Sequence, residues 1–398
     1  MQDIRNQFPF FKSNPDLIYF DSATTTHKPE SVIKTIDEFY RKHNANAGRS
    51  GYKLSVDATT QIEQVRAKVA NYINARQGDQ IIFTSGTTES NNTISYSWGL
   101  HNLKDGDEIL LSRKDHKSNI APWQNLQSIL NHFGTKITLK EIDLNARGYL
   151  FNGTDINSFV KNITSQTRLI VLPHIHNIYG VDSISSQELK TLRGLVGKKI
   201  LIALDASQSI SHIPVDVQEM GIDFLSFSGH KMFAGTGVGV LYISENAISH
   251  IHPFMVGGQP QSNIKVSLES GTQNIPEILS LGAAIDFIQR IGLESMHIYV
   301  RDITQHLIKK LNTIDSIEFL PGFALCNCYE GFGIVSFNIN GKNPNEIGFI
   351  LEQNKILVRT GSQCSTTEEE QCIRVSLHIY NTTEEIDRFI DILKEVTV

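Results

Sequence analysis

The stretch SFSGHKMFAGTGVGV, residues Ser226 to Val240, ends a short apolar β run with Ser-Gly-His-Lys and follows it with a group of glycines. In sheets built mainly from parallel strands, ligands bind where the strands end at their carboxyl edge. A lysine at such a place costs little if it faces water, but it gains a chemical role if a group is bound to it covalently. Lys231 is therefore the first candidate functional residue.

Seven short β-rich runs alternate with helix-like segments between about Ile81 and Ile243. This alternation is typical of an α/β fold, in which a mainly parallel sheet is covered by helices on both faces. The seven runs are QIIFTSGT, DEILLSRKD, KITLKEID, RLIVLPHIH, KILIALDAS, FLSFSG and GVGVLYIS.

The pattern changes after Pro276, where a long helical stretch precedes two strand-like runs, GIVSFNI and ILVRTGS, and a final amphipathic segment from Thr383 to Leu393. This order predicts a second, smaller α+β domain. We therefore expect an N-terminal segment, residues 1–16, that packs on the small domain, a large domain of residues 17–270, and a small C-terminal domain of residues 271–398.

Composition excludes several classes of protein. The 398 residues carry a formal net charge of −6 and no dense block of basic residues, so nucleic acid is not expected as a partner. No apolar run approaches the ~20 residues that span a bilayer, and the N-terminus lacks the apolar core of a signal peptide. Four cysteines are too sparse for a disulfide framework in a chain of this length. These features favour a cytoplasmic protein without a membrane partner.

Polar residues at three strand ends suggest one common ligand. Thr87 and Thr88, in TSGTTES, stand where a helix begins after a tight turn, and such a terminus either binds phosphate or is an ordinary helix cap. Asp205 follows a strand apolar enough to be buried, where a carboxylate needs a partner. With Lys231, these are the parts that pyridoxal 5'-phosphate requires: a phosphate site, an anion facing the ring nitrogen, and a lysine for a Schiff base.

Longer motifs carry a resemblance to a known family. The segments YFDSATTTHKP, DHKSNIAPW, DASQS, SFSGHKM and RTGSQC together resemble class V aminotransferase-fold enzymes of the cysteine desulfurase and selenocysteine lyase group, closest to the SUF-type branch. The resemblance covers nearly the whole chain and implies the fold type I of pyridoxal-phosphate enzymes. It further implies a homodimer that acts on L-cysteine or a related small amino acid.

The resemblance also implies a role for each matching residue. Lys231 would form the Schiff base and move protons, Asp205 would face the pyridinium nitrogen, and His116 would stack on the cofactor ring. The phosphate would be held by Thr87, Thr88, Ser228 and His230, the ring hydroxyl by Gln208, and the substrate carboxylate by Asn177, Arg359 and Arg374. Thr272 matches a residue that reaches the cofactor of the neighbouring subunit.

Cys364 bears on the type of reaction. The resemblance implies that its thiolate attacks the sulfur of the bound cysteine and becomes a persulfide, which leaves alanine. The chain departs from the SUF-type pattern nearby, because Ser362 and Gln363 replace two histidines and only ten positions separate Cys364 from Arg374. The segment from Gly257 to Thr272 is also short where those enzymes carry a β-hairpin, which bears on how a sulfur-acceptor protein could dock.

Other histidines do not predict a metal site. His174 and His176 alternate on a strand, and His250 and His252 have the same spacing. Neither pair is accompanied by the third and fourth ligands that a zinc site needs. No metal is therefore expected.

Three functions remain open at this point. The first is a cysteine desulfurase that passes sulfur to Cys364, and the second is a related C–S or C–Se lyase that does not require Cys364. The third is a non-catalytic sulfur carrier or scaffold that keeps the fold.

Overall fold

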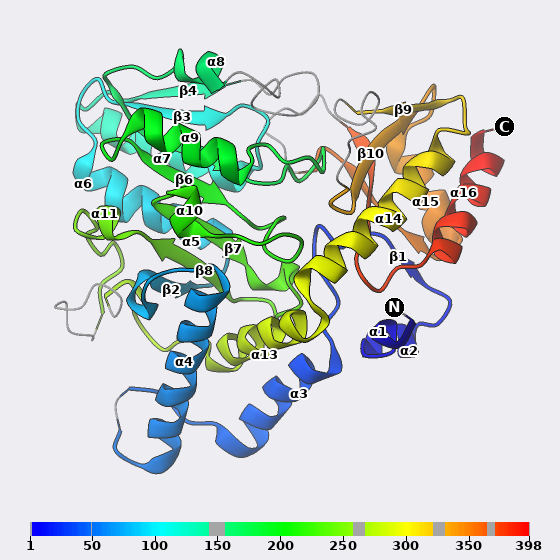
Figure 1. Cartoon of the computed structure of the whole chain (residues 1–398), viewed down its shortest axis with the longest axis horizontal. Helices are drawn as coiled ribbons and strands as arrows, with labels where there is room; N and C mark the ends of the chain where they lie inside the picture. The colour runs from blue at the N-terminus through cyan, green and yellow to red at the C-terminus, as the bar shows by residue number, and fades with distance from the viewer. Residues whose placement is uncertain are drawn as a thin grey trace.

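A computed structural model describes residues 2–48, 50–142, 156–257, 267–320, 331–363 and 371–397. Figure 1 shows two bodies side by side, a larger one around a seven-stranded sheet and a smaller one around a four-stranded sheet. The N-terminal helices α1 (Gln2–Arg5) and α2 (Pro9–Ser13) lie beneath the smaller body, near the start of the C-terminal helix α16 (Thr383–Thr397). Arg5 joins the two ends of the chain, because its guanidinium pairs with Glu385 at 2.7 Å.

All seven β-rich runs of the sequence form strands of the larger sheet, in the order β2-β8-β7-β6-β5-β3-β4. Five neighbouring strands are parallel, whereas β8 runs antiparallel to both β2 and β7. The predicted α/β fold with a mainly parallel sheet is therefore confirmed. The strands are β2 (Ile81–Thr84), β3 (Glu108–Ser112), β4 (Thr138–Ile142), β5 (Thr167–Pro173), β6 (Leu201–Asp205), β7 (Phe224–Ser228) and β8 (Gly239–Ile243).

Helices cover both faces of this sheet, as consecutive strand residues show. Ile202 and Leu204 of β6 belong to one buried apolar cluster, whereas Leu201 and Ala203 belong to another on the opposite face. Both faces of the larger sheet are therefore buried. The helical segments of this part of the chain are η2 (Gly78–Gln80), α5 (Thr87–Ile94), η3 (Ser95–Gly99), α6 (Leu100–Asn102), α7 (Lys117–His132), α8 (Ile156–Val160), α9 (Ser186–Val196), α10 (Val217–Met220), η4 (Gly229–Lys231) and α11 (Glu245–Ile248).

The smaller body is built on an antiparallel sheet in the order β12-β13-β10-β9. A separate parallel pair joins β1, from the beginning of the chain, to β11. The run ILVRTGS therefore forms two short strands in different sheets. The elements are β1 (Ile18–Tyr19), β9 (Ile317–Phe319), β10 (Ile334–Ile339), β11 (Ile356–Leu357), β12 (Arg359–Gly361), β13 (Cys372–Ser376), α14 (Leu293–Leu311) and α15 (Pro344–Gln353).

The long helical stretch after Pro276 is two helices, α13 (Ile275–Ile291) and α14, separated at Gly292. Gly292 has φ +91°, a left-handed conformation that favours glycine and ends α13. Ile278 and Ile285 of α13 are buried in the apolar cluster that also contains residues of the larger sheet. The division of the chain at residue 271 stays a prediction.

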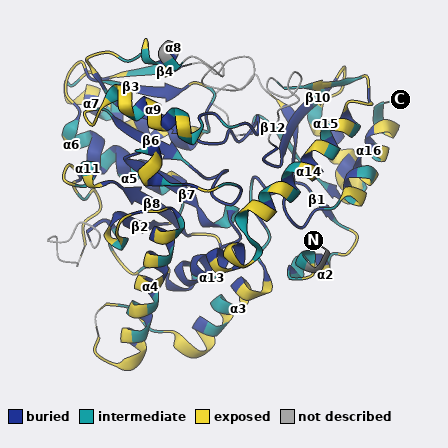
Figure 2. Cartoon of the chain, in the orientation of Figure 1, coloured by how far each residue is buried: buried dark blue, intermediate teal, exposed yellow. Residues whose placement is uncertain are grey.

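An arm projects from the larger body at the lower left of Figure 1. It consists of α3 (Glu30–Glu38), the π-helical turn η1 (Phe39–His43) and the first half of α4 (Lys53–Tyr72). Figure 2 shows this arm mostly exposed, in contrast to the buried sheet beside it. In the part of the chain that the structure describes, none of the helices combines the length and the apolar character needed to cross a bilayer.

Candidate active site

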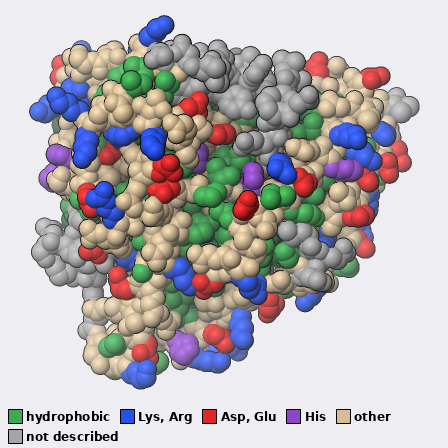
Figure 3. Space-filling view, in the orientation of Figure 1, with side chains coloured by type: hydrophobic (Ala, Val, Ile, Leu, Met, Phe, Trp, Pro, Cys, Tyr) green, Lys and Arg blue, Asp and Glu red, His purple; other side chains and the backbone are tan. Residues whose placement is uncertain are grey.

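A cavity of about 250 Å³ lies where the strands of the larger sheet end and the smaller body begins. Its wall brings together eleven of the residues predicted from the sequence, which come from both bodies. They are Thr87, Thr88, His116, Asn177, Asp205, Gln208, Ser228, His230, Lys231, Arg359 and Arg374. Figure 3 shows apolar side chains reaching the surface between the two bodies, with charged side chains scattered over the rest of this face.

Among the described residues, one predicted site residue does not lie in this wall. Thr272 lines a different cavity, together with Ser85 and Glu89. Cys364 lies outside the described residues.

The N-terminus of α5 and the end of β7 meet at one end of the cavity. The Thr87 amide donates to Ser228 Oγ at 2.9 Å, and Thr87 Oγ1 lies 2.6 Å from Ser207 Oγ. Gly86, which precedes α5, lies close against Gly239 of the neighbouring strand β8. Glycine is required at position 239, because a Cβ there would stand 2.5 Å from the Gly86 Cα. Clustered hydroxyls at a helix N-terminus suit an anion such as phosphate.

His116 is held in a defined orientation at the start of α7. Its Nδ1 accepts a hydrogen bond from the Ser118 amide at 3.2 Å, so a neutral ring carries its proton on Nε2. Burial and the positive charge of Lys231 lower the pKa of His116 to about 4, although Asp205 acts in the opposite direction. The ring is therefore neutral near pH 7.

Asp115, which also lines the cavity, supports His116. Its carboxylate accepts from the His116 amide at 2.6 Å and from Asn119 Nδ2 at 2.9 Å. Burial raises the pKa of Asp115 well above its usual range, and the nearby charge of Asp205 adds to this effect. Asp205 itself accepts from the Ser207 amide at 2.8 Å. The two carboxyl groups therefore differ in their surroundings although they share one wall.

Two arginines occupy the end of the cavity that faces the smaller body. Arg374 donates to Asp21 Oδ1 at 3.1 Å, to Thr24 Oγ1 at 2.9 Å and to the Asn177 carbonyl at 2.9 Å. Arg359 also donates to Thr24 Oγ1, at 3.3 Å. Arg374 is 3% exposed, and among the described residues its Nε has no hydrogen-bond partner. A buried donor of this kind suits an incoming carboxylate.

The peptide that precedes Lys231 is clamped from the other side of the cavity. The carbonyl of His230 accepts from the Thr26 amide at 2.9 Å, from the Thr25 and Thr26 hydroxyls, and from Lys28 Nζ at 3.2 Å. A carbonyl oxygen has two lone pairs, so the four donors share them and surround the oxygen, which fixes this peptide. Burial lowers the pKa of Lys28 to about 8.

His174 and His176, the pair with metal-like spacing, are engaged in hydrogen bonds. His174 Nδ1 lies 2.9 Å from Ser209 Oγ, and His176 Nε2 lies 3.0 Å from the Lys114 carbonyl. Burial lowers the pKa of His174 to about 4, so this ring is neutral near pH 7.

Sequence reasoning missed several residues that shape the cavity. Asp21, Thr24 and Lys28 all lie in the motif YFDSATTTHKP, to which no function was assigned residue by residue. Asp115 and Ser207 stand next to residues that were singled out. The only indication of Asp115 and Ser207 in the sequence is that each stands next to a predicted site residue. Such adjacency does not identify hydrogen-bond partners.

Comparison with known proteins places this architecture among enzymes. Residues 18–389 match the family described as aminotransferase class-V. The chain is 34% identical to a probable cysteine desulfurase from Synechocystis sp., with 98% of this chain and 94% of that protein covered. It is 35% identical to a probable cysteine desulfurase from Borreliella burgdorferi, with 99% and 95% covered.

Solved structures of cysteine desulfurases are also similar to this chain over nearly its whole length. The apo cysteine desulfurase from Thermococcus onnurineus NA1 has a TM-score of 0.89 and 30% sequence identity, with 99% of this chain and 97% of that chain covered. The cysteine desulfurase CsdA from Escherichia coli has a TM-score of 0.84 and 25% identity, with 99% and 97% covered.

Proposed function

The chain belongs to the class-V aminotransferase family, and from this membership we propose that it is a cysteine desulfurase that converts L-cysteine to L-alanine and transfers the sulfur to Cys364. The observation that carries the proposal is one cavity that holds Lys231 and Asp205 at the sheet and Arg374 at the smaller body. A non-catalytic scaffold has no chemical need for all three.

The residues of the cavity fit pyridoxal 5'-phosphate, on which the enzymes of this family depend. Thr87, Thr88, Ser228 and His230 would hold its phosphate, Gln208 its ring hydroxyl and Asp205 its ring nitrogen. Lys231 would bind its aldehyde. When bound, the cofactor supplies an electron sink for bonds broken at the amino acid.

The protein's own groups divide the remaining tasks. Arg374, with Asn177 and Arg359, binds the substrate carboxylate, for which the Arg374 Nε is an available donor. Lys231 moves protons to and from the substrate carbon, and the neutral His116 has its own proton on Nε2. Asp115 fixes the backbone of His116 and so keeps the ring in place.

In the proposed reaction, the sulfur atom of the substrate is transferred to Cys364. The Cys364 thiolate attacks the sulfur of the bound cysteine, a sulfur–sulfur bond forms and the carbon–sulfur bond breaks. The electron pair of the broken bond remains on the substrate carbon, which takes one proton. The products are a persulfide on Cys364 and alanine, and no oxidant is needed.

Incubation with L-cysteine and a reductant tests the proposal. We expect alanine as product and, when the reductant is left out, one added sulfur atom on the peptide that contains Cys364, measured by mass spectrometry. Cys372, which is buried in β13, provides an internal control that should gain none. Cys364→Ala should reduce alanine formation to background. Pyruvate and ammonia in place of alanine would favour the lyase, and full desulfuration by Cys364→Ala would contradict the persulfide route.

Arg374→Lys is expected to lower kcat/KM for L-cysteine by about ten- to a hundredfold, because an ammonium keeps the charge but loses the Nε donor and the planar contacts that orient the guanidinium. Arg359→Lys is the matched control and should have a smaller effect, since Arg359 is less buried. Steady-state alanine release measures both. Equal effects of the two substitutions would argue against Arg374 as the main carboxylate ligand.

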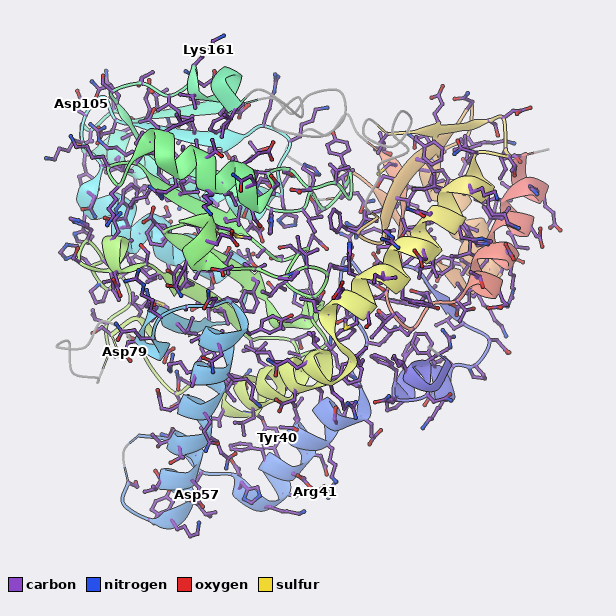
Figure 4. The ribbon with its side chains drawn as sticks, in the orientation of Figure 1. Tyr40, Arg41, Asp57, Asp79, Asp105 and Lys161 are labelled. Carbon is purple, nitrogen blue, oxygen red and sulfur yellow. The ribbon has the colours of Figure 1, made fainter. Side chains whose placement is uncertain are left out.

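A homodimer belongs to this proposal. The support is that Thr272 lies outside the first cavity and that apolar side chains are exposed on the arm, where Tyr40, Tyr52 and Val56 are each at least half exposed. Figure 4 labels Tyr40, Arg41 and Asp57 on this arm. The cytoplasm remains the proposed compartment, and a sulfur-acceptor protein the proposed second partner, with L-cysteine or a related small amino acid as substrate.

A further inference from the structure

Gln363 stands at the arginine end of the cavity in an unusual backbone conformation. Its φ is +54°, in the left-handed region that residues other than glycine seldom adopt. Its carbonyl accepts a hydrogen bond from Asn177 Nδ2 at 3.1 Å, and the Asn177 carbonyl in turn accepts from Arg374. The surrounding contacts therefore hold Gln363 in this conformation, as is common for residues that serve a site.

The side chain of Gln363 is buried and lines the cavity. It is 3% exposed, and its Nε2 donates to the Gly361 carbonyl at 3.2 Å. That bond identifies the nitrogen, so the other terminal atom is the oxygen Oε1. Across the described ranges, Oε1 has no hydrogen-bond partner. A buried acceptor left in this way costs free energy unless a ligand supplies a donor.

The chemistry of cysteine leaves one group that can supply this donor. The step rests on the proposed function, in which the substrate carboxylate pairs with the arginines and the substrate amine is taken up by the cofactor. A carboxylate has no proton to donate, so the thiol is the remaining donor of the bound cysteine. We propose that Gln363 is a specificity-determining residue, whose Oε1 accepts a hydrogen bond from the protonated thiol of the substrate.

This contact distinguishes cysteine from selenocysteine. A free thiol has a pKa of about 8.5 and is mostly protonated at neutral pH, whereas the more acidic selenol is mostly ionised there. An ionised selenol has no proton to donate, and its negative charge faces the acceptor oxygen of Gln363. The contact therefore raises the preference for sulfur over selenium relative to a site without it. The product alanine also lacks the donor, which favours its release.

Gln363→Met tests the proposal, because methionine has a similar length and no comparable hydrogen-bonding group. Alanine release is measured for L-cysteine and for L-selenocysteine with each variant. We expect the ratio of kcat/KM for cysteine to that for selenocysteine to fall by about two- to tenfold in Gln363→Met. Gln353→Met, an identical change at an exposed position of α15, is the matched control and should leave the ratio unchanged.

The thermal unfolding midpoint separates recognition from a structural role. Gln363→Met removes Oε1, which has no partner within the described part of the chain, and the single hydrogen bond from Nε2 to the Gly361 carbonyl. The midpoint of the substrate-free protein should therefore shift by no more than a few degrees. An unchanged ratio, or an equal loss with both substrates together with a large fall in the midpoint, would overturn the inference. Failure of the wild-type protein to release alanine from cysteine would instead overturn the proposed function.

Discussion

Replacing Lys231 with alanine is expected to lower alanine formation from L-cysteine by about a thousandfold or more. The substitution removes both the amine that would bind the cofactor and the base that would move protons at the substrate carbon. Lys231 stands in the turn η4, directly after the clamped carbonyl of His230, so its position is fixed by the backbone. Its loss cannot be replaced by a neighbouring group without movement of that turn.

Borohydride reduction of the loaded protein, followed by peptide mass spectrometry, identifies the lysine that carries the cofactor. We expect the added mass on residue 231 in the wild-type protein and none in Lys231→Ala. Lys28→Met is the matched control, because the three protons of the Lys28 ammonium donate to two carbonyls and a hydroxyl, and it should retain the adduct on residue 231. An adduct on any other lysine would contradict the proposed site.

Acidification from pH 7.5 to pH 5.5 is expected to lower the free energy of unfolding by about 5 kcal/mol, a large share of the stability of an ordinary protein. Burial lowers the pKa of His27 and His174 to about 4 and of His212 to about 3, and it lowers the pKa of His378 well below its usual value. Above pH 6.5 these rings are neutral in both states and contribute nothing. Below it the unfolded chain takes up protons that the fold excludes, so stability is lost.

Urea unfolding at the two pH values and one protein concentration measures this loss. Each histidine contributes up to about 1.4 kcal/mol per pH unit between the unfolded pKa of 6.5 and its folded value. His116 and His230, whose pKa is also lowered to about 4 in the fold, add to this loss, whereas Asp115 opposes it because its pKa is raised. These two contributions partly cancel. His212→Phe should reduce the pH dependence by about one histidine's share. A free energy of unfolding independent of pH in this window would contradict the expectation that the fold keeps these rings neutral.

The larger sheet could be predicted from the sequence because its strands are buried on both faces. Runs such as LIALD and IIFT are continuous in apolar residues and end in polar ones, and this pattern depends on local sequence alone. The same locality explains why Thr87, Asp205 and Lys231 could be placed at one edge. Parallel strands bring their ends together whatever connects them.

The arginine end of the cavity could not be predicted in the same way. The contact between Arg374 and Asp21 joins residues from opposite ends of the chain, and no local sequence pattern predicts it. The burial of the Gln363 amide could not be predicted from the sequence either, because a glutamine in a polar segment is usually exposed. The break between α13 and α14 was overlooked because the apolar pattern continues across Gly292.

The pairing of β1 with β11 has a consequence for how the protein is made. On the ribosome, the first strand of the small parallel pair emerges long before its partner at Ile356–Leu357 has been translated. The half of the pocket that carries Lys231 can assemble earlier, from residues already synthesised. A chain interrupted before β13 therefore contains the part of the pocket with Lys231 and lacks the part with Arg374. Translation must run nearly to the end of the chain before the pocket can bind an amino acid with both parts.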